Sequence, residues 1–455
     1  MTGPEASSLV RVRTGAWYSD REIDLAFPAG WQVQVHRPEL PEPLDRHQVA
    51  ARVHHPAAGP ALRDLAHQAR RVSILVDDLT RPTPAAAILP HILSEFAAAG
   101  VSPLTITVLL ATGAHRVSLT REALEAKLGV EAMASCRVVV HDHRGATVRI
   151  GTTSYGTPVH LDRAVAGSDL VVGVGGVYPQ HTVGFGGGSK IVLGALGTRS
   201  IAALHYRHRG GEGAYDVEND FRHDLDEVAR LARLRFVVVG HVDADRALVR
   251  VTSGEPVAVH GPEVDFAMRM FRTSPPDEAD VVVANAYPMD VSLTFARSKG
   301  VIPFSHAKPG ASRVLIADCP EGVGRHDLFP LQRDAADRVR HLLRKVTSEP
   351  AAVPGRTLRS LRRRAGVRTR PDEGPVRPSI LWCSGGYSGG PGRTGGLVPV
   401  SSWQQLIERV SSQQGDRAGL RVAVYPCAPL QIMEAGVHAD EALGRPGGLG
   451  DLSGQ

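Results

Sequence analysis

Short runs of apolar residues recur along the first half of the chain, and polar loops and longer stretches separate them. Each run has the length and composition of a buried strand, and the four runs lie at 72–76, 104–110, 137–140 and 169–174. An alanine-rich helix is predicted to follow the first run and to end near Ala99, and another to span 120–128. Because strand, loop and helix repeat in this order, the pattern predicts a doubly wound parallel sheet.

A second set of apolar runs begins near residue 277, after the linker-like segment 273–278. These strands are expected at 279–286, 313–317, 378–382 and 420–425. The predicted fold class is therefore α/β, with parallel-rich sheets in two units. The predicted organisation is an N-terminal unit over 1–274, a second α/β unit over 275–442 and a flexible glycine-rich tail over 443–455.

Composition narrows the class of protein. The 455 residues are 42% hydrophobic and 22% charged, with a net charge of +5, which is typical of a soluble globular chain. Much of the basic excess lies in 350–377, interpreted as a solvated loop insertion rather than a nucleic-acid site.

Targeting signals and cysteine spacing both bear on the compartment in which the protein is expected. No apolar run reaches the roughly 18 residues of a membrane span, and the N-terminal segment lacks the apolar core of a signal peptide. The four cysteines form no CxxC pair, which fits a reducing compartment. We expect a cytoplasmic protein that binds neither nucleic acid nor membrane.

Polar residues gather where the predicted strands of the first unit end. In open parallel sheets, ligands bind at the carboxyl edge of the strands. The side chains expected on this rim are Asp78, Arg81, His115, His141, Gln180, His181 and Lys190. Any one of them alone is usually structural, but together they predict a site. His141 and His143 form a pair that can bind metal or simply close the rim, whereas His306 and His326 are interpreted as loop residues of the second unit.

The glycine-rich stretch from His181 to Lys190 follows a predicted strand and presents a single lysine. Glycines let the backbone approach a ligand and offer amide groups to anions. Lysine is a point cation, or a nucleophile once its pKa is lowered. A Walker A loop requires Gly-Lys-Ser/Thr, whereas Ser189 here precedes the lysine. A phosphate-binding enzyme, such as a kinase or nucleotide transferase, is the alternative interpretation.

Five ordered motifs together resemble the nickel-dependent lactate racemase family, over roughly residues 15–330. They are Asp77–Pro82, Thr112–Arg116, Pro179–Leu193, Tyr287–Asp290 with Lys299 and Lys308–Gly310, and Asp318–Gly324. The resemblance implies two α/β domains with the active site in the cleft between them. It also implies a nickel-pincer nucleotide, a pyridinium ring whose two sulfur-bearing arms hold nickel, and separate proteins that build this cofactor.

The resemblance further implies a reaction. Hydride leaves a 2-hydroxy acid for the cofactor, a planar 2-keto acid forms, and hydride returns to the other face. Lys190 would carry the cofactor through a covalent thioamide, and His205, with His208 as the fallback, would ligate nickel. The other implied residues are His115 as general base, Arg81 and Lys299 on the substrate, and Asp78, Thr80, Gly186, Gly187 and Gly188 at the cofactor.

Two points qualify this assignment. An ungapped alignment of the glycine loop places Gln180 where the family has a second catalytic histidine, with His181 adjacent. Neighbouring residues of an extended chain face opposite sides, so either a bulge brings His181 in or one histidine base remains. Lys190 and His205 would lie about 22 Å apart on one straight helix, so a break near Gly194 or Gly197 is expected. The predicted function is a racemase or epimerase of a 2-hydroxy acid, and a non-catalytic relative that binds the cofactor is a further alternative.

Overall fold

Two six-stranded, mostly parallel sheets organise the protein, which confirms the predicted α/β fold class. The computed structural model describes residues 8–180, 182–208, 215–329, 331, 339, 343, 377–387, 394–415 and 417–433. The predicted tail over 443–455 lies outside these residues, as does the predicted loop insertion over 350–377 apart from its last residue.

The first sheet contains the four strands predicted from the apolar runs of the first half. Its order is β14-β13-β10-β4-β5-β7, and all neighbours are parallel except β13 and β14. The strands span Val72–Asp77 (β4), Ile106–Ala111 (β5), Arg137–Val140 (β7), Leu170–Gly176 (β10), Leu234–Val242 (β13) and Leu248–Gly254 (β14). All residues of β4 and β10 are buried, as their continuous apolar runs predict.

The strand order creates a switch point between β4 and β10. From β4 the chain builds outward through β5 and β7, and it then returns to the other side of β4 with β10 and β13. Connections on the two sides of such a point lead away from each other, which leaves a crevice at the carboxyl ends of the two central strands. Asp77 ends β4 at this edge, Asp78 follows it, and the glycine loop follows β10.

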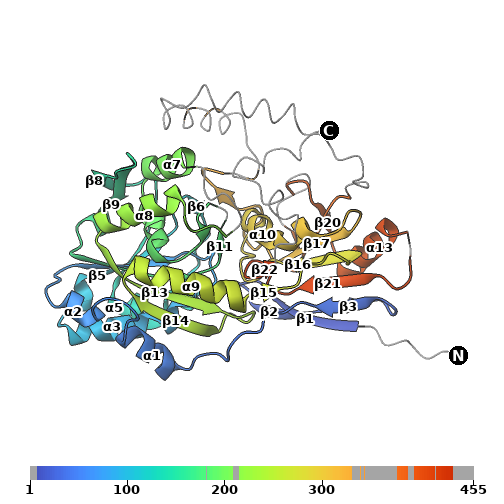
Figure 1. Ribbon diagram of the computed structural model, residues 1–455, viewed down its shortest axis with the longest axis horizontal. Helices are drawn as coiled ribbons and strands as arrows, with labels where there is room; N and C mark the ends of the chain where they lie inside the picture. The colour runs from blue at the N-terminus through green and yellow to red at the C-terminus, as the bar shows by residue number, and fades with distance from the viewer. Residues whose placement is uncertain are drawn as a thin grey trace.

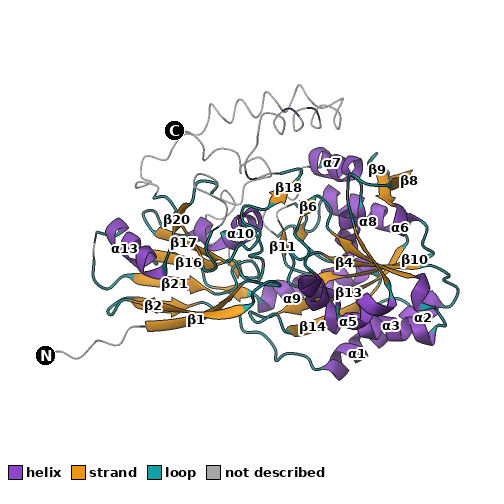
Figure 2. Cartoon of the chain, turned by 180° about the vertical axis from the view of Figure 1, so that it is seen from behind, coloured by secondary structure: helices purple, strands orange, loops and turns teal. Residues whose placement is uncertain are grey.

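Helices cover both sides of the first sheet, with α2, α3 and α5 on one side and α7 and α8 on the other (Figures 1 and 2). The helices span Arg46–His54 (α1), Leu62–Ala66 (α2), Leu89–Ala98 (α3), Arg121–Leu128 (α4), Val130–Ser135 (α5), Arg163–Ala166 (α6), Thr198–Arg207 (α7), Asp220–Leu231 (α8) and Pro256–Met270 (α9). The 3₁₀ segments are Ala85–Ala87 (η1), Pro103–Thr105 (η2) and Gly188–Ala195 (η3). The helices predicted near Ala99 and over 120–128 are α3 and α4. Thr120 caps α4 by accepting the Ala123 backbone N–H at 3.1 Å.

The second sheet has the order β20-β19-β17-β16-β21-β3, and all its neighbours are parallel. Its strands span Gln32–Val35 (β3), Val281–Asn285 (β16), Ser312–Ala317 (β17), Ile380–Cys383 (β19), Val398–Val400 (β20) and Arg421–Tyr425 (β21). Leu293–Gly300 (α10), Ile302–His306 (η4) and Trp403–Gln413 (α13) accompany it. Figure 1 shows β1, β2 and β3 in blue beside the orange and red strands, so the N-terminal segment contributes to this sheet. The division at residue 274 stays a prediction.

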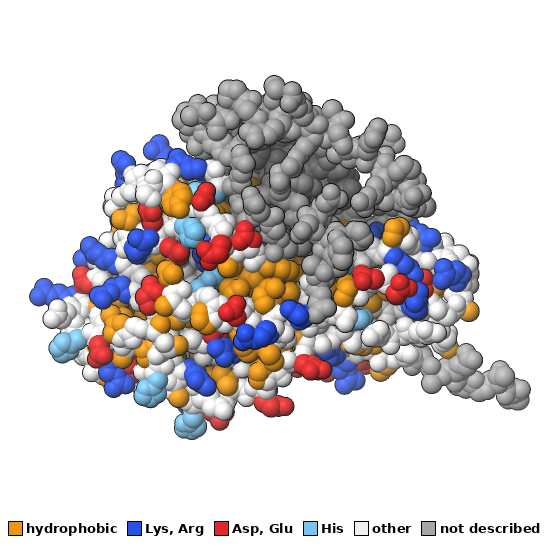
Figure 3. Space-filling model, in the orientation of Figure 1, with side chains coloured by type: hydrophobic (Ala, Val, Ile, Leu, Met, Phe, Trp, Pro, Cys, Tyr) orange, Lys and Arg blue, Asp and Glu red, His pale blue; other side chains and the backbone are white. Residues whose placement is uncertain are grey.

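Short strand pairs complete the fold. They are β1 (Ser8–Thr14) with β2 (Arg21–Phe27), β6 (His115–Arg116) with β18 (Arg325–His326), β8 (Thr147–Thr152) with β9 (Pro158–Asp162), β11 (Pro179–Gln180) with β12 (Gly184–Phe185), and β15 (Arg272–Thr273) with β22 (Ile432–Met433). On the face in Figure 3, acidic and basic side chains are interspersed over the described surface. None of the helices in the described part of the chain is long and apolar enough to cross a membrane.

Candidate functional site

A cavity opens at the carboxyl edge of the first sheet, at the switch point between β4 and β10. Its volume is about 100 Å³. The predicted site residues that line it are Asp78, Arg81, His115, Gln180, Gly186, Gly187, Gly188, Lys190 and His205. The strand order thus brings segments more than a hundred residues apart to one place.

Asp78 and His115 form a buried pair in this cavity. Asp78, only 1% exposed, accepts a hydrogen bond from Nδ1 of His115 at 2.7 Å. Burial alone would raise the pKa of Asp78, but His115, Arg81 and Thr80 hold it down at about 2. Burial lowers the pKa of His115, although Asp78 opposes this. The imidazole is therefore neutral near pH 7, and Asp78 fixes the tautomer whose Nε2 can accept a proton.

Arg81 and Thr80 follow Asp78 on the same loop. Arg81 is 6% exposed and lies 5.5 Å from the centre of the Tyr178 ring. Within the described residues, its guanidinium forms no ion pair with a carboxylate and donates only to the Thr80 carbonyl at 3.3 Å. A buried guanidinium that has Asp78 as an electrostatic neighbour but no salt bridge suits an anionic ligand. Thr80 does not line the cavity but donates its backbone N–H to Asp78 at 3.0 Å.

Lys190 lies on η3, at the end of the glycine loop. Burial, together with repulsion from Arg81 and Arg222, lowers the pKa of its amino group to about 7. Near neutral pH a large share of this amine is therefore uncharged, which is the nucleophilic form. The structure thus supplies the lowered pKa that nucleophilic use of Lys190 requires.

The glycine loop is held in one conformation by close contacts. Gly187 and Gly188 have positive φ values of 79° and 57°, and a Cβ on Gly187 would lie 2.5 Å from the side chain of Val177. Arg222 donates to the Gly187 carbonyl at 3.1 Å and also to Phe185. Only glycine fits these positions without strain, so the loop can present its backbone closely to a ligand.

The helical segment is interrupted between Lys190 and His205, as the distance between these residues on one straight helix predicts. The 3₁₀ segment η3 ends at Ala195, and α7 begins at Thr198. His205 donates Nδ1–H to the Ile201 carbonyl at 2.8 Å, and burial lowers its pKa to about 4. It therefore presents a neutral Nε2 lone pair at the cavity, the arrangement found in metal-ligating histidines. The fallback His208 instead bonds Asp224 at 2.6 Å and does not line the cavity.

Three predicted site residues remain: Lys299, Gln180 and His181. Lys299 is buried but does not line the cavity; its ammonium is 3.5 Å from the Pro179 carbonyl, and burial holds its pKa well below the usual value. Gln180 lines the cavity and accepts the Thr182 backbone N–H at 3.3 Å. His181 lies outside the described residues.

His141 and His143 have structural partners. His141 bonds Asp162 at 2.7 Å and the Leu196 carbonyl at 2.9 Å, while His143 bonds Thr198 at 2.8 Å and Asp327 at 3.0 Å. Both nitrogens of each ring are engaged, and neither residue lines the cavity. In the part of the chain that the structure describes, no group of three or more His, Cys, Asp or Glu side chains could hold a metal ion.

Sequence reasoning missed His326. Interpreted as a loop residue of the second unit, it lies on β18, pairs with His115 on β6 and lines the cavity. The two rings are 5.0 Å apart between centroids. Tyr178, the partner of Arg81, was also missed. Neither residue belongs to a recognisable motif; only the tertiary pairing reveals them.

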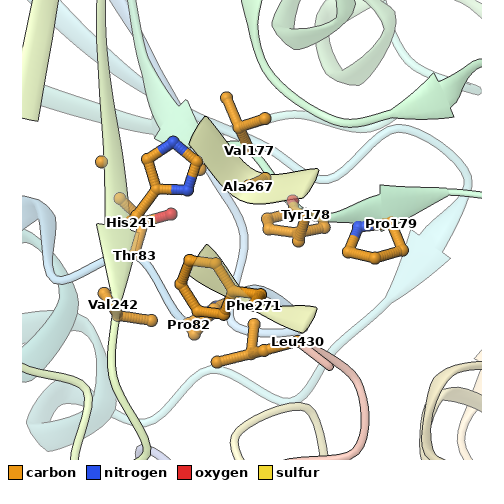
Figure 4. Close-up of a pocket in the computed structure, with 12 residues that line it drawn as sticks. Pro82, Thr83, Val177, Tyr178, Pro179, His241, Val242, Ala267, Phe271 and Leu430 are labelled. Carbon is orange, nitrogen blue, oxygen red and sulfur yellow. The ribbon is translucent and has the colours of Figure 1, made fainter. Parts of the chain in front are cut away.

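A smaller pocket lies beyond Tyr178, with the rings of His241, Tyr178 and Phe271 around it (Figure 4). Its volume of about 10 Å³ is room for one water molecule. Nδ1 of His241 is buried there without a hydrogen-bond partner among the described residues. This pocket shares Gly176 and Tyr178 with the main cavity but contains none of the predicted site residues.

Comparisons with known proteins agree on one family. The model of the lactate racemase N-terminal domain matches residues 18–214. Lactate racemase of Thermoanaerobacterium thermosaccharolyticum is 27% identical over 286 residues, 61% of this chain and 66% of that protein. Lactate racemase of Lactiplantibacillus plantarum is 26% identical over 295 residues, 62% of this chain and 68% of that protein. The alignments thus span about two thirds of these relatives.

Solved structures share the fold. The lactate racemase apoprotein from Thermoanaerobacterium thermosaccharolyticum superposes with a TM-score of 0.66 and 21% identity, covering 94% of this chain and all of that one. A crystal structure of a protein from Thermotoga maritima gives a TM-score of 0.57 and 13% identity, covering 87% and 100% of the two chains. At these identities the likeness supports the fold alone.

Proposed function

Because the chain belongs to the lactate racemase family, we propose that it is an isomerase that inverts C2 of a 2-hydroxy acid. One observation carries this proposal: three groups meet in one cavity, namely the Asp78–His115 pair, the amine of Lys190 with its lowered pKa, and Nε2 of His205, which has no hydrogen-bond partner among the described residues. A base for the hydroxyl proton, an anchor for a cofactor and a ligand for its metal are then within reach of one small molecule.

The residues present fit a nickel-pincer nucleotide. Lys190 offers an amine suited to covalent attachment, and His205 offers one neutral imidazole donor, a ligand type that suits nickel. The other donors would come from the sulfur arms of the cofactor, so no cluster of protein ligands is needed. When bound, this cofactor supplies the hydride acceptor of the reaction. The chain would obtain it from separate proteins that build it.

The side chains of the protein would handle the proton and the charge. His115 Nε2 would accept the hydroxyl proton, and Asp78 would stabilise the imidazolium that forms. Arg81 would bind the substrate carboxylate with its planar fork. Lys299 does not line the cavity, so a direct contact with the substrate would require it to move.

The test uses the chain co-expressed with the proteins that build the cofactor. We expect a mass adduct on the peptide that contains Lys190, bound nickel, and inversion of at least one acid among lactate, malate, mandelate and gluconate by chiral chromatography. Lys190→Arg keeps a cation but cannot form the thioamide, so it should lose adduct, nickel and turnover. Lys308→Arg is the matched control and should behave as the unaltered chain. An unmodified Lys190 in a nickel-free protein would contradict the proposal.

A further inference from the structure

His326 brings a second imidazole to His115 from a distant part of the chain. The two residues are directly opposite in the antiparallel pair β6–β18, a relation that places side chains on the same face. Their rings are 5.0 Å apart between centroids, with an interplanar angle of 65°. Both line the main cavity, so a small ligand next to one ring is also next to the other.

The β18 strand is held firmly in this place. Asp327, which follows His326, donates its backbone N–H to the Ala114 carbonyl at 2.9 Å. Its buried carboxylate accepts from Arg116 at 2.9 Å and from Arg325 at 2.8 Å, and it also bonds His143 at 3.0 Å. These charge-assisted bonds fix the strand on both sides of the cavity rim. The position of the His326 ring is therefore determined before any ligand binds.

The hydrogen bonds of the two rings make them opposite in character. His115 donates Nδ1–H to Asp78 at 2.7 Å, so its Nε2 carries a lone pair. His326 accepts the backbone N–H groups of Leu328 and Phe329 at Nδ1, both at 3.2 Å. A neutral imidazole whose Nδ1 is an acceptor carries its proton on Nε2. Neither Nε2 atom has a hydrogen-bond partner among the described residues, so one acceptor and one donor remain for a ligand.

We propose that His326 is a catalytic residue that donates a hydrogen bond from Nε2 to the reacting oxygen of the 2-hydroxy acid. The inference rests on the proposed function and deepens it. A hydroxyl group is itself one donor and one acceptor, so it complements the two rings: its hydrogen points to Nε2 of His115, and its oxygen accepts from Nε2–H of His326.

The step balances with these two groups. The O–H bond breaks and its proton moves to Nε2 of His115. The C2–H bond would break with its electron pair on the hydrogen, and the cofactor, when bound, would supply the acceptor for this hydride. The electron pair of the O–H bond forms the second bond of the ketone. The ketone oxygen then accepts hydrogen bonds from both rings. An ungapped alignment places Gln180, which is not a base at neutral pH, where the family has its second histidine; with this alignment, His326 would supply the second imidazole contact.

Two substitutions separate this role from a structural one. His326→Asn keeps an acceptor near Nδ1 for Leu328 and Phe329 but removes the donor at Nε2. His326→Gln places an amide N–H near Nε2 but leaves the two backbone N–H groups without their acceptor. We expect activity and stability to rank the variants in opposite orders. His306→Asn, a histidine of η4 outside the cavity, is the control.

The measurements use the cofactor-loaded enzyme, its melting temperature, and its dissociation constant for pyruvate as a keto-acid probe. His326→Asn should lower kcat/KM about 100-fold and weaken pyruvate binding, while its melting temperature stays near that of the unaltered enzyme. His326→Gln should melt lower but recover activity above the Asn variant. If activity follows the melting temperature instead, with Asn above Gln, the inference is wrong although the racemase remains. An unaltered enzyme that inverts no acid in the panel would overturn the proposed function and this inference with it.

Discussion

At the scale of single residues, burial gives the charged groups of the cavity different protonation states. Asp78 stays ionised because His115, Arg81 and Thr80 outweigh the cost of its burial. For Lys190 the balance is reversed, because burial and repulsion from Arg81 and Arg222 outweigh the attraction of Asp78 and Asp77. One cavity can therefore hold a carboxylate and an uncharged amine side by side. This separation would allow covalent attachment at Lys190 and proton transfer at His115 at the same pH.

The lowered pKa of Lys190 predicts how its reactivity depends on pH. The amine is uncharged above about pH 7, whereas an ordinary lysine has a pKa of about 10.4. In the cofactor-free chain, the rate of reductive methylation at Lys190 should therefore rise through pH 7 and level off above it. Peptide mass spectrometry over a pH series gives this profile, with Lys308 as the comparison in the same digest.

Arg81→Met provides the control for that measurement. Arg81 is the largest charged contributor that lowers the pKa of Lys190, so its removal should shift the midpoint to higher pH. A midpoint near 10 in the unaltered chain would mean that the amine is charged at neutral pH. The fit of Lys190 to covalent attachment would then be lost. The midpoint depends on protonation and not on how freely the reagent enters the cavity.

At the scale of elements, sequence reasoning succeeded where one segment contains all the information. The run before Asp77 is apolar apart from Ser73 and is followed by two carboxylates, so β4 and its polar edge could be predicted. The helix ending near Ala99 and the break between Lys190 and His205 also follow from local spacing. His326 could not be predicted, because β18 pairs with a strand 211 positions away, and its register depends on contacts of Asp327.

The N-terminal strand β3 shows the same limit. Its four residues alternate between exposed and half-buried and are too few to indicate a partner, yet they extend the second sheet beside β21. The cavity likewise combines residues that the sequence pattern predicted with residues that it did not. Asp78, His115 and Lys190 follow predicted strands, whereas Tyr178 and His326 carry no motif. Motifs therefore predicted the reactive residues of the site better than the other residues that line the cavity.

The contact between η3 and β5 predicts a strong effect of one methyl group. A Cβ on Gly194 would lie 2.4 Å from the Ala111 carbonyl oxygen, which is backbone and cannot turn aside. Gly194 also accepts the Gly113 N–H at 2.9 Å. Gly194→Ala should displace η3 and lower the free energy of unfolding by about 1–3 kcal/mol, measured by urea denaturation.

Gly261→Ala is the matched control for this substitution. Gly261 lies within α9 and precedes Pro262, and a Cβ there would meet no atom within 4 Å outside its chain neighbours and the helix's own backbone. The helix gain of replacing glycine is opposed by the contact of the new Cβ with Pro262, so this change should alter the stability by less than about 1 kcal/mol. Because η3 carries Lys190, only the Gly194 variant should also reduce cofactor attachment. Equal stability in the two variants would show that η3 and β5 can separate without cost.

At the scale of the whole molecule, the N-terminal turn connects the two sheets through Trp17. Asp290, which follows β16, accepts the backbone N–H groups of Gly15 at 2.8 Å and Ala16 at 3.2 Å. The next residue donates its indole N–H to the Arg81 carbonyl at 3.2 Å. Its ring also lies 4.7 Å from the Lys127 ammonium and 4.1 Å from the Arg246 guanidinium. A loop of the second sheet is thereby joined to the backbone of a cavity residue.

This connection predicts that Trp17→Phe affects substrate binding as well as stability. The phenyl ring retains the contacts with both cations but cannot donate to the Arg81 carbonyl. The matched control is Trp403→Phe. This variant loses the hydrogen bond that the Trp403 indole N–H donates to the Ala26 carbonyl, at 2.7 Å, beside the second sheet. Each variant should lose about 0.5–1.5 kcal/mol of unfolding free energy. Only Trp17→Phe should also raise the KM for the hydroxy acid, because the Arg81 carbonyl would lose the indole N–H and keep only the Lys127 ammonium, at 3.2 Å, among its side-chain donors in the described residues. If both variants keep the KM of the unaltered enzyme, the turn stabilises the fold without positioning the site.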